Sequence, residues 1–190
     1  MTKGKVIVVS APSGCGKSTI INSIFDSKRF DLHFSVSATN RPPRAGEVDG
    51  EDYHFLSTEE FQRLVAEDQF IEWEEVYPER YYGTLRAEVD RQIEQGHNVV
   101  LDIDVKGALN VKRFYGCDSC CIFIQPPSID ELRHRLENRG TETDDSIATR
   151  IDRAQYELSF AEKFDHIVVN DDLNVAIAQV AELFANFIEK

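Results

Sequence analysis

The stretch SAPSGCGKST, residues 10–19, decides the fold, because it follows the apolar run Val6 to Val9 and has the spacing of a phosphate-binding loop. The usual pattern, G-x-x-x-x-G-K-[ST], joins a strand to a helix. In such a loop, backbone N–H groups and the positive helix end hold phosphate oxygens. Lys17 would reach the β- and γ-phosphates, and the hydroxyl of Ser18 would bind Mg²⁺. The stretch therefore predicts nucleotide binding.

The first glycine of that pattern is replaced by Ala11. A methyl group fits at the entry to the loop if the backbone keeps a negative φ. Gly14 and Gly16 retain the freedom to bend that phosphate contact requires. We therefore expect an intact site for the phosphates of ATP, formed by Ala11, Pro12, Ser13, Gly14, Cys15, Gly16, Lys17, Ser18 and Thr19.

Length and composition predict one compact domain that binds small molecules. The 190 residues, 42% hydrophobic and 29% charged, can bury one sizeable core. The N-terminal apolar run is too short for a signal peptide, and no run reaches the roughly 18 apolar residues of a membrane span. We therefore expect a cytoplasmic protein. The net charge of -13 argues against nucleic-acid polymers and anionic membranes as partners. Nothing indicates an obligate protein partner.

The four cysteines are expected to be reduced thiols. The stretch CDSCC, residues 117–121, resembles half of a metal clip, but no second pair of ligands stands at a suitable spacing. Because CCIFIQ, residues 120–125, has the pattern of a buried strand, we favour a structural role for these cysteines.

Apolar runs of strand length alternate with helical patterns, which predicts a parallel sheet with helices on both faces. The expected core strands are residues 5–10, 98–104, 120–125 and 166–170. The expected helices are residues 17–25, 85–95, 129–138, 146–164 and 175–188, the third of them starting at a capping box of Ser128 and Glu131. Residues 34–79 instead hold short β-like runs and one helix capped by Ser57 or Thr58, which predicts an inserted β-rich lobe.

Two carboxylates, Asp102 and Asp104, stand at the predicted carboxyl end of the strand over residues 98–104. Ligands bind at this end of the strands in open α/β sheets. Being two residues apart, the two side chains would point to the same side of the strand, and one could complete the magnesium shell through water. The alternatives are a helix cap and an ion pair.

Three arginines, Arg135, Arg139 and Arg150, flank a polar turn between two predicted helices. Phosphoryl transfer requires alignment of the reactants and neutralisation of phosphate oxygens in a dry site. A helical arm that carries arginines could close over bound phosphates as a lid, although arginines are also common on exposed helices.

These segments resemble, in the same order and over nearly the whole chain, those of the guanylate kinases, which transfer phosphate from ATP to GMP. The resemblance rests on SAPSGCGKST, FSVSATNRPPRAGEVDGEDYHF, FIEWEEV, YYGT, LDIDVKGA, LRHRLENRGTE and VVNDDL. It implies a three-layer P-loop kinase fold in a single domain. The implied parts are a core of residues 1–34, 97–128 and 155–190, a GMP-binding lobe of residues 35–96, and a lid of residues 129–154.

The resemblance also implies a role for each site residue. The GMP phosphate would be held by Arg41, Arg44, Tyr53 and Tyr82, with Glu47 ordering the arginines. The guanine would be read by Glu72, Asp104, Ser37 and Thr84, and Asp102 would lie near the acceptor phosphate and the metal. The transferring group would be met by Lys17, Arg41, Arg139 and Arg150, and the adenine by Asn170 and Arg135. Without the resemblance, the two tyrosines and Glu72 would be interpreted as ordinary strand residues.

Two other functions share much of this pattern. Guanylate-kinase-like scaffolds bind phosphopeptides, but they usually lack the phosphate-loop or lid residues that are present here. A kinase of the same fold could act on AMP or dTMP, against which the pairing of Glu72 with Thr84 argues. The expected reaction is the transfer of the γ-phosphoryl group of Mg-ATP to GMP, and to dGMP, in purine nucleotide metabolism and GMP recycling.

Overall fold

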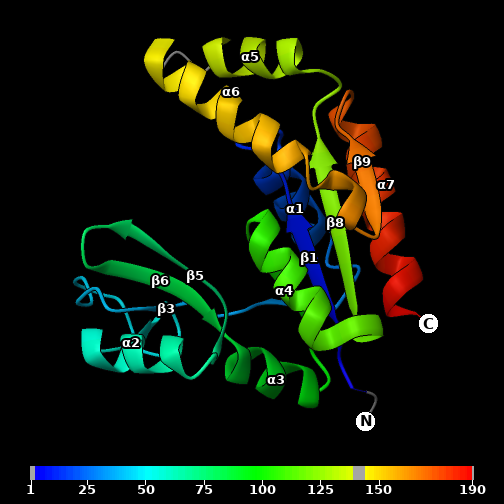
Figure 1. Cartoon of the computed structure of the whole chain (residues 1–190). Helices are drawn as coiled ribbons and strands as arrows, with labels where there is room; N and C mark the ends of the chain where they lie inside the picture. The colour runs from blue at the N-terminus through cyan, green and yellow to red at the C-terminus, as the bar shows by residue number, and fades with distance from the viewer. Residues whose placement is uncertain (1–2, 139–143, 190) are drawn as a thin grey trace.

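The computed structural model describes residues 3–138 and 144–189. Five parallel strands form the core sheet in the order β2, β7, β1, β8, β9 (Figure 1). Their bounds are Leu32–Phe34 for β2, Asn98–Asp102 for β7, Val6–Ser10 for β1, Ser119–Gln125 for β8 and His166–Val169 for β9. The predicted parallel α/β sheet is confirmed.

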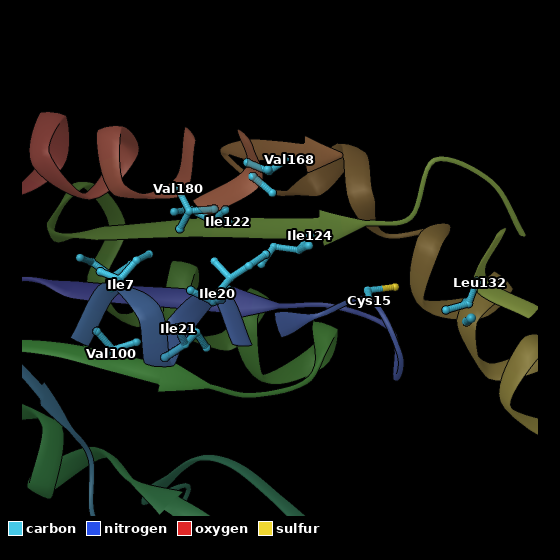
Figure 2. Close-up of a cluster of buried hydrophobic side chains, with 14 of the residues drawn as sticks. Ile7, Cys15, Ile20, Ile21, Val100, Ile122, Ile124, Leu132, Val168 and Val180 are labelled. Carbon is cyan, nitrogen blue, oxygen red and sulfur yellow. The ribbon is translucent and has the colours of Figure 1, made fainter. Parts of the chain in front are cut away.

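Helices cover both faces of this sheet because the central strands carry buried apolar residues on both sides. One face of β1, with Ile7 and Val9, packs with α1 (Lys17–Asp26), α5 (Ile129–Asn138), α6 (Asp144–Leu158) and α7 (Leu173–Ile188). The other face, with Val6 and Val8, packs with α3 (Arg86–Glu94) and α4 (Val105–Tyr115). Figure 2 shows Ile7, Ile20 and Ile122 gathered between β1, α1 and β8.

A second sheet lies beside the core, at the left of Figure 1. Its strands follow the order β4 (His54–Phe55), β3 (Ala38–Thr39), β6 (Arg80–Leu85), β5 (Phe70–Tyr77). Helix α2 (Thr58–Ala66) covers it, and Phe61 of that helix stacks on Phe70 at 4.4 Å between ring centroids. Of the two predicted caps, Ser57 caps α2, since its hydroxyl accepts from the backbone N–H of Glu60 at 3.1 Å. The predicted inserted β-rich lobe is present.

Several predicted boundaries were wrong. Strand β7 ends at Asp102, because Asp104 caps α4, a helix that the sequence analysis did not predict. The two carboxylates therefore do not share one side of a strand. Helix α6 ends at Leu158, and the chain turns through the 3₁₀ helix Ala161–Lys163 so that Phe164 can pack 5.1 Å from Phe123.

The cap of α5 is confirmed in part. The hydroxyl of Ser128 accepts from the backbone N–H of Glu131 at 3.0 Å, as predicted. The carboxylate of Glu131 accepts from Arg135 at 2.8 Å instead of turning back to complete the capping box. A second 3₁₀ helix, Gly116–Asp118, precedes β8. No helix in the described part of the chain is long and apolar enough to cross a membrane.

Candidate active site

The loop between β1 and α1 has the backbone shape that phosphate binding requires. Gly14 has φ 91° and Gly16 has φ 83°, both in the left-handed region, and α1 begins directly after Gly16. Within the described ranges, the non-glycine residues with positive φ are Lys28, Asp68 and Glu79. Ala11 therefore keeps the negative φ expected of it, so the missing first glycine does not distort the loop.

Asn170, the residue after β9, contacts the backbone of this loop. Its side-chain amide donates to the backbone carbonyl of Cys15 at 2.8 Å, and a Cβ at Gly16 would lie 2.5 Å from the same amide nitrogen. Arg135 of α5 donates to the carbonyl of Asn170 at 2.9 Å. Burial raises the pKa of the Cys15 thiol to about 12, so the thiol is neutral and packs as a small apolar group. These contacts tie the loop to the end of β9 and to α5.

The loop lysine contacts a carboxylate of the neighbouring strand. Lys17 forms an ion pair with Asp102, whose backbone stands opposite Val9 in the parallel register of β1 and β7. Both side chains remain partly exposed, at 21% and 36%. The pair is consequently accessible to an incoming phosphate. Ser18 and Thr19, in the first turn of α1, are exposed at the same end of the sheet.

One predicted lid arginine reaches the loop. Arg150 of α6 donates to the hydroxyl of Ser13 at 2.8 Å, across 137 positions of sequence. Figure 1 shows α5 and α6 together beyond the end of β8. Arg139 lies outside the described residues. The arrangement brings a guanidinium to the rim of the phosphate loop.

A second cationic group lies on the lobe. Arg41 donates through both terminal nitrogens to the carboxylate of Glu47, each at 2.8 Å, and the backbone N–H of Arg44 donates to the same carboxylate at 2.7 Å. The hydrogen bonds from Arg41 and Arg44 lower the pKa of Glu47 to about 2, and Glu47 raises the pKa of Arg41. Glu47 is thus a permanent anion that fixes the Arg41 guanidinium in place.

Two tyrosines stand beside this pair. The Arg41 guanidinium lies 5.2 Å from the ring centroid of Tyr53, and the Tyr53 and Tyr82 rings meet edge to face at 5.9 Å. The Nε of Arg41 is buried and has no hydrogen-bond partner in the described part of the chain. One N–H of Arg41 is therefore left without a hydrogen bond beside the two rings.

A cavity of about 800 Å³ separates the lobe from the core sheet. It brings together five of the residues predicted to bind GMP, namely Ser37, Glu72, Thr84, Asp102 and Asp104. Arg41, Arg44, Glu47, Tyr53 and Tyr82 are not among its lining residues and form the separate cluster described above. Asp102 connects the cavity with the phosphate loop through its ion pair with Lys17.

Glu72 of β5 is a carboxylate on the wall of the cavity. Its carboxylate accepts from the hydroxyl of Thr84 at 2.6 Å, since the two residues are cross-strand neighbours of β5 and β6. Burial raises the pKa of Glu72, and the nearby carboxylate of Asp104 adds to the rise. Asp104 itself accepts from the backbone N–H of Gly107 at 2.8 Å, which uses one of its oxygens. Both alternatives for this carboxylate pair are thus realised, the cap at Asp104 and the ion pair at Asp102.

The family model for guanylate kinase matches residues 3–187. The chain belongs to the guanylate kinase family. A guanylate kinase of Bacteroides fragilis is 52% identical over 98% of this chain and 91% of its own length. One of Porphyromonas gingivalis is 48% identical over 98% and 99%. The crystal structure of guanylate kinase from Anaplasma phagocytophilum superposes with a TM-score of 0.69 at 30% identity, over 100% of this chain and 89% of that one.

Membership confirms the resemblance drawn from the sequence, the P-loop kinase fold and the assignment as an enzyme. Guanylate kinases phosphorylate GMP. The roles of the individual site residues in this chain, which the resemblance implied, stay predictions.

Sequence reasoning missed three residues of the cavity wall. Gly107 lets α4 approach β5, because a Cβ there would lie 2.9 Å from side-chain carbons of Glu72. Asn110 donates to the carbonyl of Ile71 at 2.8 Å and ties the same two elements together. Ser35 lines the cavity with a buried hydroxyl that has no partner in the described ranges. The sequence signal for the first two was the cap Asp104, since its N-cap position places Gly107 and Asn110 on a following helix.

Proposed function

We propose that this member of the guanylate kinase family transfers the γ-phosphoryl group of Mg-ATP to GMP and dGMP, giving ADP and GDP or dGDP. The observation that carries the proposal is the cavity that holds the Glu72 and Thr84 pair at one end and Asp102, in contact with the phosphate-loop lysine, at the other. A base bound beside Glu72 and Thr84 would therefore share one cavity with the carboxylate that contacts the phosphate-loop lysine.

Guanine fits the polar wall of the cavity by its pattern of donors and acceptors. Guanine presents N1–H and an exocyclic amine as donors, which the carboxylates of Glu72 and Asp104 can accept. The hydroxyl of Ser37 can donate to O6, and that of Thr84 can do so when its single O–H turns from Glu72 to the base. Adenine has no N1–H and carries an amine at position 6, so buried polar groups would be left unpaired. The contacts proposed here do not include the 2′-hydroxyl, so dGMP should also be accepted.

The acceptor phosphate is assigned to the arginine cluster of the lobe. Two guanidiniums, of Arg41 and Arg44, can grip a phosphate dianion, and the hydroxyls of Tyr53 and Tyr82 can donate from the remaining sides. Glu47 would hold Arg41 in a fixed orientation through its two 2.8 Å hydrogen bonds. The GMP phosphate is already an anionic nucleophile near neutral pH, so the mechanism needs no general base.

The donor nucleotide is assigned to the loop of residues 11–19. Its backbone N–H groups would cradle the phosphates, while Lys17 would move from Asp102 to the transferring group, joined by Arg41, Arg139 and Arg150. Asn170 and Arg135 would lie beside the adenine. Arg150 already reaches the loop through Ser13, so a small movement of α6 would bring its guanidinium to the γ-phosphate.

The residues present suit a magnesium ion. The hydroxyl of Ser18 and the carboxylate of Asp102 are hard oxygen ligands on adjacent elements, the second acting through water. Bound there with ATP, the ion would neutralise charge on the β- and γ-phosphates. The chain itself would orient the two phosphates in line and exclude water when the lobe of residues 35–96 and the lid of residues 129–154 close on the core.

We place this activity in purine nucleotide metabolism and GMP recycling, in the cytoplasm. The thiols of Cys15, Cys117 and Cys121 form no disulfide, which is consistent with a reducing compartment.

An assay of ADP release with GMP, dGMP, AMP, dTMP and CMP as acceptors tests the proposal. We expect GMP and dGMP to give the largest kcat/KM and AMP to be a poor substrate. Activity strongest with AMP or dTMP, or no ADP release with any acceptor, would overturn it. Scattering profiles with and without both nucleotides should differ, since closure would compact the molecule, and identical profiles would contradict the closing step.

A further inference from the structure

Three side chains that commonly bind transition metals meet at the edge of the core sheet. Asp31 directly precedes β2, His33 is the middle residue of β2, and His97 directly precedes β7. The Nε2 of His33 lies 2.9 Å from one carboxylate oxygen of Asp31, and the Nδ1 of His97 lies 3.6 Å from the other. The amino ends of parallel strands lie at one end of the sheet and the carboxyl ends at the other. The phosphate loop follows the carboxyl end of β1, so this cluster lies at the opposite end of the strands. The catalytic residues proposed above do not include it.

The backbone that carries these side chains is fixed by the sheet. Leu32 stands opposite Asn98 in the pairing of β2 with β7, which sets Asp31 beside His97. The side chain of Asn98 donates to the carbonyl of Asp31 at 3.3 Å and accepts from the backbone N–H of Lys5 at 3.2 Å. Gly4 packs so closely that a Cβ there would lie 1.9 Å from the carbonyl oxygen of His97. The three side chains therefore start from positions that the fold determines.

We propose that Asp31, His33 and His97 bind a divalent transition metal, Zn²⁺ above all, with one coordination position open to water. Two imidazoles and one carboxylate are a donor set typical of zinc, whereas magnesium prefers oxygen alone. One ligand atom from each residue lies within 4.8 Å of the other two. In a tetrahedral zinc site ligand atoms are about 3.3 Å apart, given Zn–N and Zn–O bonds of about 2.0–2.1 Å.

The remaining adjustment is small and the side chains are able to make it. They are 40% exposed at His33, 70% at Asp31 and 36% at His97, so rotation about their side-chain bonds meets little resistance. The His33 and His97 rings are 4.0 Å apart between centroids and are tilted by 42°, so they would have to spread slightly to turn both nitrogens to one ion. Bound metal would clamp the edge strand β2 to β7. Because β2 leads directly into the lobe, the clamp would strengthen the base of that connection.

The test measures metal binding in the nucleotide-free protein, in which the phosphate loop contributes no ATP-bound magnesium. Cys117 is an exposed thiol that could bind zinc by itself, so a Cys117→Ser protein is the starting point. Titration calorimetry with Zn²⁺ should show one equivalent bound, and Co²⁺ should give the visible absorption bands of a tetrahedral site. His33→Gln and His97→Gln should each weaken binding at least about 10-fold, and Zn²⁺ should raise the melting temperature of the parent but not of the double variant.

His166→Gln, which removes an exposed histidine outside the cluster, is the matched control and should bind as the parent does. Melting without metal and phosphoryl transfer with Mg-ATP report whether the two histidine variants remain folded. Absence of binding by the Cys117→Ser protein, or binding that survives both histidine substitutions, would show that the cluster is an ion-pair network only.

Discussion

Glu72→Gln isolates the reading of guanine, because it removes a charge from the cavity and keeps nearly the same shape. Glutamine can still accept the hydrogen bond that Thr84 donates at 2.6 Å. It can accept only one of the two guanine donors and presents its own N–H₂ to the other. A hydrogen bond to a charged group contributes about 1.5–3 kcal/mol, so kcat/KM for GMP should fall about 10- to 150-fold.

Steady-state kinetics with each nucleotide varied in turn measures this loss. The KM for ATP should stay within about 2-fold of wild type, since ATP is assigned to the other end of the site. Glu74→Gln is the matched control, because it removes the same charge from the same cavity. Glu74 lies two residues further along β5 and has no proposed contact with guanine. Equal losses for GMP and ATP, or equal losses in the two variants, would refute the assignment of Glu72 to guanine.

The same variant should not lose stability. Burial raises the pKa of Glu72 above its ordinary value of 4.5, so the folded state takes up the proton at a higher pH than the unfolded chain does. Relative to the ionised form, the protonated carboxyl adds to the free energy of unfolding. This contribution is fully present below the unfolded pKa and is lost as the pH rises through the folded pKa. Because glutamine resembles the protonated form, Glu72→Gln should be at least as stable as wild type at pH 7, with the difference shrinking toward pH 4.5. A lower melting temperature at pH 7 would mean that the charge is compensated in the fold.

Three further substitutions test the loop and the lobe. Gly16→Ala should lower the free energy of unfolding in urea by at least about 2 kcal/mol, and the control Gly50→Ala by about 1 kcal/mol. Both glycines have positive φ, but of the two only Gly16 has a neighbour within 4 Å of a new Cβ. Equal losses would rule out the clash. Glu47→Gln should raise the KM for GMP about 10-fold, since one hydrogen bond to Arg41 is lost, and should leave the KM for ATP unchanged. Because the pKa of Glu47 is about 2, its ion pair with Arg41 is present at higher pH and is lost only as the pH falls through that value. A change in the wild-type KM for GMP between about pH 5 and 8 would therefore come from another group. Lys17→Ala should abolish turnover with an unchanged circular dichroism spectrum, and a retained kcat would exclude the lysine from the chemistry.

Local pattern was enough to predict most of the fold. Strand β1, the following loop and α1 could be assigned because an apolar run, a glycine-rich turn and a helical pattern are short-range signals. Helix α4 was missed because the strand was predicted to run to Asp104, although a helix cap was among the alternatives for that residue. The late end predicted for α6 had a different cause, since the turn there serves the packing of Phe164 against a distant strand.

The residue types of the site were also evident from the sequence, but their pairing was not. The sequence by itself determined that the chain carries an intact phosphate loop, an α/β core and a guanidinium-rich inserted lobe, because these depend on glycine φ, on hydrophobic period and on composition. Only the tertiary structure decided that Lys17 meets Asp102, that Glu47 grips Arg41 and that Asp31 joins two histidines. Such contacts depend on strand register and loop conformation, which arise when residues far apart in the chain pack together.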